Sequence, residues 1–199
     1  NNGSTGVSQV SEIIMSENAV ISGNTTTGGG GGIFDFKNIV MSGNAAISGN
    51  TVARNSYNPG KENGGGIWGS GNITMSGNAV IRGNTAAENG GGIYGYGSIT
   101  ISENAVISGN TAKKGGGIYS LGDTLSLTGG EISGNKAEYG AGVYIEKGTG
   151  TQKGGTITAN EAEFVGGGVY VQNGGAFTAE GGTVSGNTAG DGGNDIFKQ

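Results

Sequence analysis

Seven aromatic residues stand in one recurring sequence context that could bind a ligand. Each directly follows an isoleucine or valine after a glycine-rich step, and from Trp68 to Tyr170 the spacing is 25 or 26 residues. The seven are Phe34, Trp68, Tyr94, Tyr119, Tyr144, Tyr170 and Phe197. Exposed rings in a row could stack on sugars or dock another protein. On this hypothesis the ligand-binding strip consists of Trp68, Tyr94, Tyr119, Tyr144 and Tyr170.

A structural explanation of the same aromatic residues competes with the binding strip. Each ring follows an inward-facing aliphatic residue by one position, so strand alternation places the rings on the outer face. There they could stack on one another and cover neighbouring glycine backbone. We favour this structural explanation, and the residues alone leave both open.

Residues suited to catalysis are sparse. The chain has no histidine and no cysteine, which removes Ser-His-Asp triads, thiolate nucleophiles and histidine-based metal sites. Glycosidases need paired carboxylates, whereas the aspartates at 35, 123, 191 and 195 are spread along the chain and neither arginine lies near an acidic pair. The stretch Gly190–Asp195 is a single copy, and calcium repeats need several copies at a fixed period. We therefore expect no catalytic residue, no metal and no cofactor.

A second column consists of asparagines in the repeated step Ile/Val-x-Gly-Asn, of which Ile157–Asn160 is a degenerate copy. Its members are Asn24, Asn50, Asn84, Asn110, Asn135, Asn160 and Asn187. Stacked amides can bond one another and satisfy backbone groups at a bend. We interpret this column as a structural asparagine ladder.

Such columns require elements that hold equivalent residues one above another. Glycine makes up 48 of the 199 residues and falls mainly in repeating corners. Between the corners, runs such as Ile73–Met75 and Ile99–Ile101 alternate with strand periodicity. About seven copies of about 25 residues, each with three short strands, predict an all-β fold, a single-stranded, right-handed parallel β-helix (β-solenoid). Strand-crossover chirality favours the right hand.

Three aliphatic columns are expected to face the inside of this solenoid. The first comprises Ile21, Ile47, Ile81, Ile107, Ile132, Ile157 and Val184. The second comprises the aliphatic residues before the aromatics, from Ile33 to Ile196. The third comprises Met15, Met41, Met75, Ile101 and Leu127.

Charge and hydropathy exclude two kinds of partner. The net charge is −5 and the basic residues are scattered, whereas nucleic-acid-binding proteins concentrate lysine and arginine on one face. No apolar run approaches the roughly 20 residues of a membrane span. We expect no nucleic-acid binding and no membrane insertion by this segment.

The repeats predict one β-helix domain over residues 1–199, as a segment of a longer surface protein. Residues 1–12 are expected to be irregular or a partial coil. Residues 51–63 hold the insertion of the longest coil, which reads as a surface loop or as a loop that carries specificity. Neither end shows a capping helix, and open coil ends invite end-to-end stacking.

The pairing of Ile-x-Gly-Asn with Gly-Gly-Ile-Tyr, over about residues 13–197, resembles the repeats of polymorphic outer-membrane proteins and related adhesin-like surface proteins. The resemblance implies a right-handed, pectate-lyase-like β-helix that is exported and displayed on the cell surface. The same fold hosts polysaccharide lyases and hydrolases, so it does not by itself exclude catalysis.

The predicted function is a non-enzymatic, extracellular structural or adhesive segment. Its partners would be a host glycan, a host surface protein or further copies of itself, end to end. The alternatives are a glycan-binding module that uses the aromatic strip and a degenerate polysaccharide lyase or hydrolase.

Overall fold

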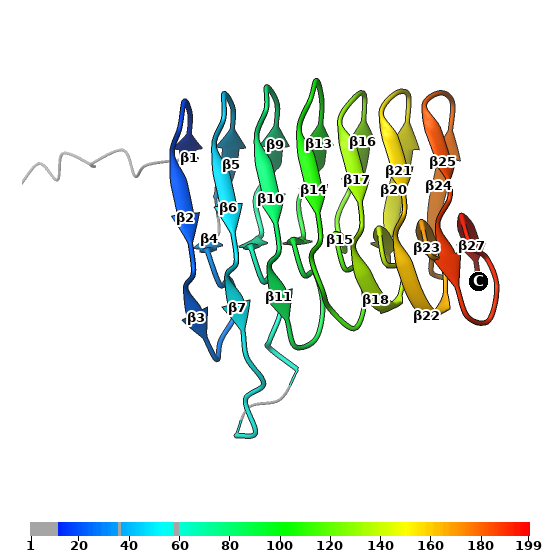
Figure 1. Cartoon of the computed structure of the whole chain (residues 1–199), viewed down its shortest axis with the longest axis horizontal. Coiled ribbons are helices and arrows are strands. Elements are labelled where there is room, and N and C mark those ends of the chain that lie inside the picture. Colours follow the sequence, from blue (N-terminus) through cyan, green and yellow to red (C-terminus); the bar gives the residue numbers. More distant parts are fainter. Residues whose placement is uncertain (1–11, 36, 58–59) are drawn as a thin grey trace, which may run out of the picture.

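The computed structural model describes residues 12–35, 37–57 and 60–199, and the secondary structure assigned within them is β-strand (Figure 1). The chain winds through seven coils that stand side by side, and each coil pairs in parallel with the next (Figure 1). The predicted all-β parallel solenoid of seven coils is confirmed. Of the predicted irregular segment 1–12, residues 1–11 lie outside the described residues, and Glu12 begins a strand.

Three seven-stranded parallel sheets form the walls, and every coil passes through them in the same order. The first sheet contains β1 (Glu12–Met15), β5 (Asn38–Met41), β9 (Ile73–Met75), β13 (Ile99–Ile101), β16 (Thr124–Leu127), β20 (Gly148–Gln152) and β24 (Gly175–Ala179). The second contains β2 (Val20–Ser22), β6 (Ala46–Ser48), β10 (Val80–Arg82), β14 (Val106–Ser108), β17 (Glu131–Ser133), β21 (Thr156–Thr158) and β25 (Thr183–Ser185). The third contains β4 (Ile33–Asp35), β8 (Ile67–Gly69), β12 (Ile93–Gly95), β15 (Ile118–Ser120), β19 (Val143–Ile145), β23 (Val169–Val171) and β27 (Ile196–Lys198).

A fourth, shorter ladder lies between the second and third sheets. It consists of β3 (Thr25–Thr26), β7 (Thr51–Val52) and β11 (Thr85–Ala86), and of β18 (Lys136–Tyr139), β22 (Glu161–Val165) and β26 (Thr188–Ala189). Thr111 joins the two halves through isolated bridges to Thr85 and Lys136. The prediction of three strands per coil is confirmed for the long sheets. It did not include this ladder, in which four of the six strands have only two residues, too few to show alternation.

The three predicted aliphatic columns form the central core. Residues such as Ile47, Ile67 and Met75 have no exposed surface, and each column stays in register from coil to coil. The third column continues beyond Leu127 with Gln152 and Ala179. Gln152 is fully buried, and its side-chain amide donates to the carbonyls of Gly155 and Thr183 at 3.2 Å.

The asparagine column is hydrogen-bonded continuously from the first coil to the last. In each step the Nδ2 and backbone N–H groups of one asparagine donate to the Oδ1 of the next, at 2.9–3.0 Å. Nδ2 also donates to an isoleucine carbonyl of the preceding coil, as Asn110 does to Ile81 at 3.1 Å. From Asn50 to Asn160 these side chains have no exposed surface.

The ladder ends on Asp195. Its Oδ1 accepts from the Asn187 backbone N–H at 3.2 Å and from Asn187 Nδ2 at 3.0 Å, where another asparagine would otherwise stand. Because Val169 pairs with Ile196, Asp195 aligns with Gly168 of the preceding coil. The equivalent residue is a glycine in every earlier coil. The last donors of the ladder are therefore satisfied by a carboxylate of the same coil.

Candidate binding pocket at the coil insertion

The seven predicted aromatic residues form one continuous column on the third sheet. Each is the middle residue of its strand, and the register pairs them from Phe34 through Phe197. Neighbouring rings stack with centroids 4.5–6.4 Å apart and interplanar angles of 6–21°. The structural explanation of mutual ring stacking is therefore confirmed.

Most of the column is buried although it lies outside the central core. Tyr94, Tyr119, Tyr144 and Tyr170 are each less than 9% exposed. The glycine-rich segment that returns to the third sheet covers them: a Cβ on Gly140 would lie within about 3 Å of the Cβ atoms of Tyr144 and Tyr170. Alternation alone predicted outward-facing rings, but it could not show this covering layer, which leaves less than a tenth of each of these tyrosines exposed.

Burial changes the acidity of these tyrosines. It raises the pKa of Tyr144 to about 12, with a smaller contribution from Tyr170 and Tyr139. Burial also raises the pKa of Tyr94, helped by the hydrogen bond between its hydroxyl and that of Tyr96 at 3.4 Å. The neutral phenol is therefore the form that the folded column stabilises.

We expect the fold to lose stability as the pH rises from about 10 to about 12. Unfolded tyrosine ionises near pH 10, whereas folded Tyr144 holds its proton to about pH 12. A raised folded pKa contributes stability that is complete below the unfolded pKa and is lost as the pH rises through the folded one. Thermal melts followed by circular dichroism across this range measure the effect. Tyr144→Phe should show a shallower decline, and an equally steep decline in that variant would contradict the assignment.

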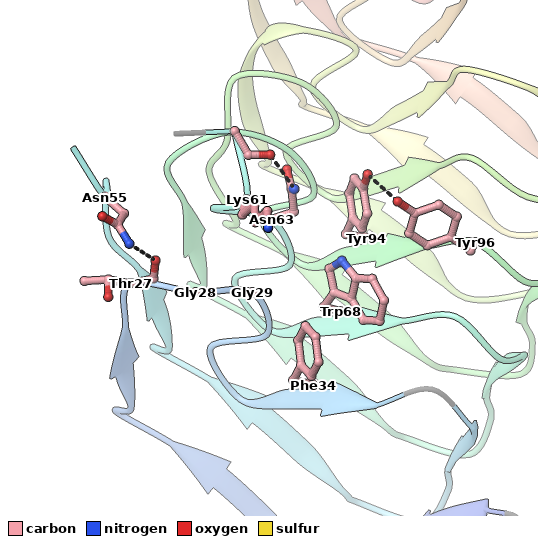
Figure 2. A pocket seen from close by; sticks show the side chains of 11 residues that line it. Thr27, Gly28, Gly29, Phe34, Asn55, Lys61, Asn63, Trp68, Tyr94 and Tyr96 are labelled. Atoms are coloured by element: carbon pink, nitrogen blue, oxygen red, sulfur yellow. Dashed lines mark hydrogen bonds between the residues drawn. The ribbon is translucent and has the colours of Figure 1, made fainter. Parts of the chain in front are cut away.

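A pocket of about 400 Å³ opens beside the first rings of the column (Figure 2). One wall consists of Phe34, Trp68, Tyr94 and Tyr96, and the opposite wall is backbone and polar. The opposite wall is formed by Thr27, Gly28, Gly29, Asn55, Gly60, Lys61 and Asn63. Among the described residues that line the pocket, Lys61 is the one with a charged side chain.

The pocket exists because the residues that cover the rings are small at this end. The covering position directly precedes a glycine of positive φ in each coil. Its members are Gly29, Asn63, Asn89, Lys114, Tyr139, Val165 and Gly192. In the later coils long side chains lie over the rings: Lys114 Nζ is 5.3 Å from the Tyr144 ring centroid, and Tyr139 packs edge-on against Tyr170. Gly29 has no side chain that could lie over the neighbouring rings, and Phe34, the first ring of the column, is 51% exposed.

The coil insertion supplies the polar wall and is held by Glu62. This buried carboxylate accepts from the backbone N–H groups of Asn55 at 2.8 Å and Gly60 at 2.6 Å. The bond from Asn55 is the main cause of the lowered pKa of Glu62, against the opposing effect of desolvation. Glu62 therefore joins the two sides of the loop, at Asn55 and at Gly60, and the neighbouring Lys61 lines the pocket. Of the predicted insertion at 51–63, Thr51 and Val52 form β7, and residues 58 and 59 lie outside the described residues.

Two amides of the polar wall are held in place by hydrogen bonds that Figure 2 shows. Asn55 Nδ2 donates to the Thr27 carbonyl at 3.3 Å, and Asn63 Nδ2 donates to the Gly60 carbonyl at 3.3 Å (Figure 2). Asn63 Oδ1 also accepts from Asn89 Nδ2 at 2.9 Å. These bonds join the insertion to the coils on both sides of it.

The structure divides the predicted aromatic strip. Trp68 and Tyr94 line this pocket, whereas Tyr144 and Tyr170 line a second one of about 350 Å³, together with Lys114, Tyr139, Gln172 and Gln199, and Tyr119 lines neither. Ligand binding by the strip stays a prediction, and geometry favours its first coils. The predicted strip did not include Phe34, Tyr96 or the polar wall. Two features of the sequence could have indicated these residues: Tyr96 stands two residues after Tyr94, and the coil that holds the insertion is unusually long.

Within residues 12–35, 37–57 and 60–199, no group of three or more histidine, cysteine, aspartate or glutamate side chains is placed to hold a metal ion. Asp195, part of the stretch weighed as a calcium site, instead accepts from Asn187. None of the described segments forms a helix long and apolar enough to span a bilayer.

Two consecutive coils match a known family. Residues 72–96 and 98–121 match the model of the Chlamydia polymorphic membrane protein repeat. No curated protein and no solved structure matches the chain. The chain is thus a parallel β-helix repeat protein that resembles the surface repeats of this family, and the similarity is consistent with a surface-associated, adhesin-like protein.

Proposed function

We propose that this chain is a non-catalytic structural and adhesive segment of a protein displayed outside the cell. The observation that carries the proposal is the unbroken stacking of seven coils, in which asparagine and aromatic columns continue from one coil to the next. Such stacking makes a stiff rod, because each coil is bonded to both neighbours along its whole path. The similarity to the polymorphic membrane protein repeat supports a place on the cell surface.

The adhesive contact we favour is with a partner rather than with further copies at the C-terminal face. In the ladder register an added coil would need to place an asparagine where Asp195 already stands. The insertion, in contrast, projects past the neighbouring coils (Figure 1) and carries the polar wall of the pocket. Departures from a repeat that gather on one face of a solenoid are typical of binding surfaces.

Adhesion is tested by coating beads with the full chain. Coated beads should adhere to cultured host epithelial cells more than beads coated with albumin, since a folded adhesive segment needs no other component. Adhesion equal to that of albumin-coated beads would contradict the adhesive function. Incubation with plant and microbial polysaccharides tests the enzymatic alternative, and turnover that one carboxylate substitution abolishes would overturn the non-catalytic assignment.

A further inference from the structure

We propose that the pocket beside the insertion binds an oligosaccharide, with one pyranose ring against Tyr96 and the outer edge of Trp68. The inference rests on the proposed adhesive function and names the chemistry of its contact. It is argued from the shape of the aromatic wall, the groups opposite it and the size of the cavity.

The aromatic wall is angular and partly exposed. Trp68 stacks on Phe34 with centroids 4.5 Å apart, and its step to Tyr94, at 6.4 Å, is the widest in the column. Tyr96 stands outside the stack, because its ring is tilted by 59° from Trp68 and by 80° from Tyr94. Tyr96 is therefore not one of the stacked rings, and it is 44% exposed.

A pyranose ring matches such a wall better than a wholly apolar ligand. It has a face of C–H groups, whose slight positive charge is attracted to an aromatic face, and a rim of hydroxyl groups that need hydrogen-bond partners. The opposite wall offers the Asn55 and Asn63 amides, the Lys61 ammonium and the backbone of Gly28 and Gly29. Apolar surface on one side and several polar groups on the other are typical of small-ligand sites.

The volume of the pocket limits how much of an oligosaccharide it can hold. About 400 Å³ lies near the lower end of the roughly 300–1,000 Å³ of small-ligand pockets. The pocket is partly open to solvent, so that sugar units on either side of the bound ring can extend over the coil surface. An internal unit of a longer glycan therefore fits as well as an end, which suits adhesion to a polysaccharide coat.

Two variants change the pocket while leaving the stacked coils of the β-helix in place. Tyr96→Ala removes an exposed ring outside the stack, and Gly29→Val fills the pocket, since a Cβ on Gly29 would lie 3.1–3.3 Å from the Phe34 and Trp68 rings. Tyr57→Ala is the matched control, because Tyr57 belongs to the same insertion, is 100% exposed and does not line the pocket. Circular dichroism confirms that each variant folds.

Binding is measured by isothermal titration with oligosaccharides of glucose, mannose, galactose and N-acetylglucosamine. We expect at least one to bind, Tyr96→Ala to weaken it by about tenfold, Gly29→Val to weaken it further, and Tyr57→Ala to leave it unchanged. No binding to any of the four series, or equal binding by Tyr96→Ala, would overturn the inference. If coated beads still adhere to cells in that case, the adhesive function stands and its ligand is not a sugar in this pocket.

Discussion

Replacing Asn110 by alanine should destabilise the solenoid by about 4 kcal/mol, because buried polar groups that lose their partner each cost about 1–3 kcal/mol. Asn110 Oδ1 accepts from the backbone N–H and Nδ2 of Asn84, and its Nδ2 donates to the Ile81 carbonyl. The side chain has no exposed surface, so water cannot replace these bonds. Urea denaturation followed by far-ultraviolet circular dichroism measures the loss.

The chain offers a matched control on the outer surface. Asn78 also stands in a ladder, bonded to Asn44 at 3.0 Å and to Asn104 at 3.3 Å, but it is exposed. Asn78→Ala should cost less than about 1 kcal/mol, since water replaces the amide. A loss at Asn110 no larger than that at Asn78 would contradict the role of the buried ladder.

A conservative variant tests why an acidic residue stands only at the end of the ladder. Asn110→Asp keeps an acceptor for Asn84 but turns a second oxygen toward the Ile81 carbonyl and Asn135 Oδ1, which now accept from Asn110 Nδ2. It should therefore destabilise the fold nearly as much as alanine. Asp195 avoids this conflict, because it only has to accept from Asn187.

Replacing Gly117 by alanine should cost at least about 3 kcal/mol, the upper part of the range for overpacking a core. A Cβ at this position would lie 2.5 Å from the Gly142 carbonyl oxygen and 3.1 Å from Asn135 Nδ2. Both atoms belong to the next coil and are held in the stack, so the methyl group would push the two coils apart. The denaturation midpoint and the protection of the Asn135 amide from hydrogen exchange should both fall.

Gly109→Ala separates this steric effect from the backbone preference of glycine. Gly109 has a φ of +62°, but a Cβ there would meet only Gly83 N at 3.9 Å. The substitution should cost about 1 kcal/mol, the penalty for a left-handed residue with a side chain. If Gly109→Ala proved the more harmful, close coil packing would not explain the glycine at 117.

Much of the fold could be predicted from residue spacing. The asparagine and aliphatic columns were predicted correctly, because each member recurs at a constant distance from the glycine corner and parallel stacking preserves that distance. Prediction was less complete where the repeat is irregular. Gln152 replaces an aliphatic residue in the third column, and Asp195 replaces a glycine, and neither role could be assigned without the neighbouring coil.

The candidate site was predicted only in part, because the spacing of the rings does not show which of them are covered. The spacing of Trp68 and Tyr94 placed both in one column, but spacing is the same for exposed and covered rings. Lys114 lies over the ring of Tyr144, whereas Gly29 has no side chain that could lie over Phe34 or Trp68. Exposure thus depends on the size of a residue in a different segment of the coil.

The sequence by itself determined the number of coils, the strand register and which residues share a column, because in a solenoid these follow from a period along the chain. Only the tertiary structure decided which columns meet solvent, because that depends on how the glycine-rich segments fold back over the rings. It likewise decided that Glu62 draws the insertion across the start of the aromatic column. The pocket arises where that insertion and the smallest covering residues coincide.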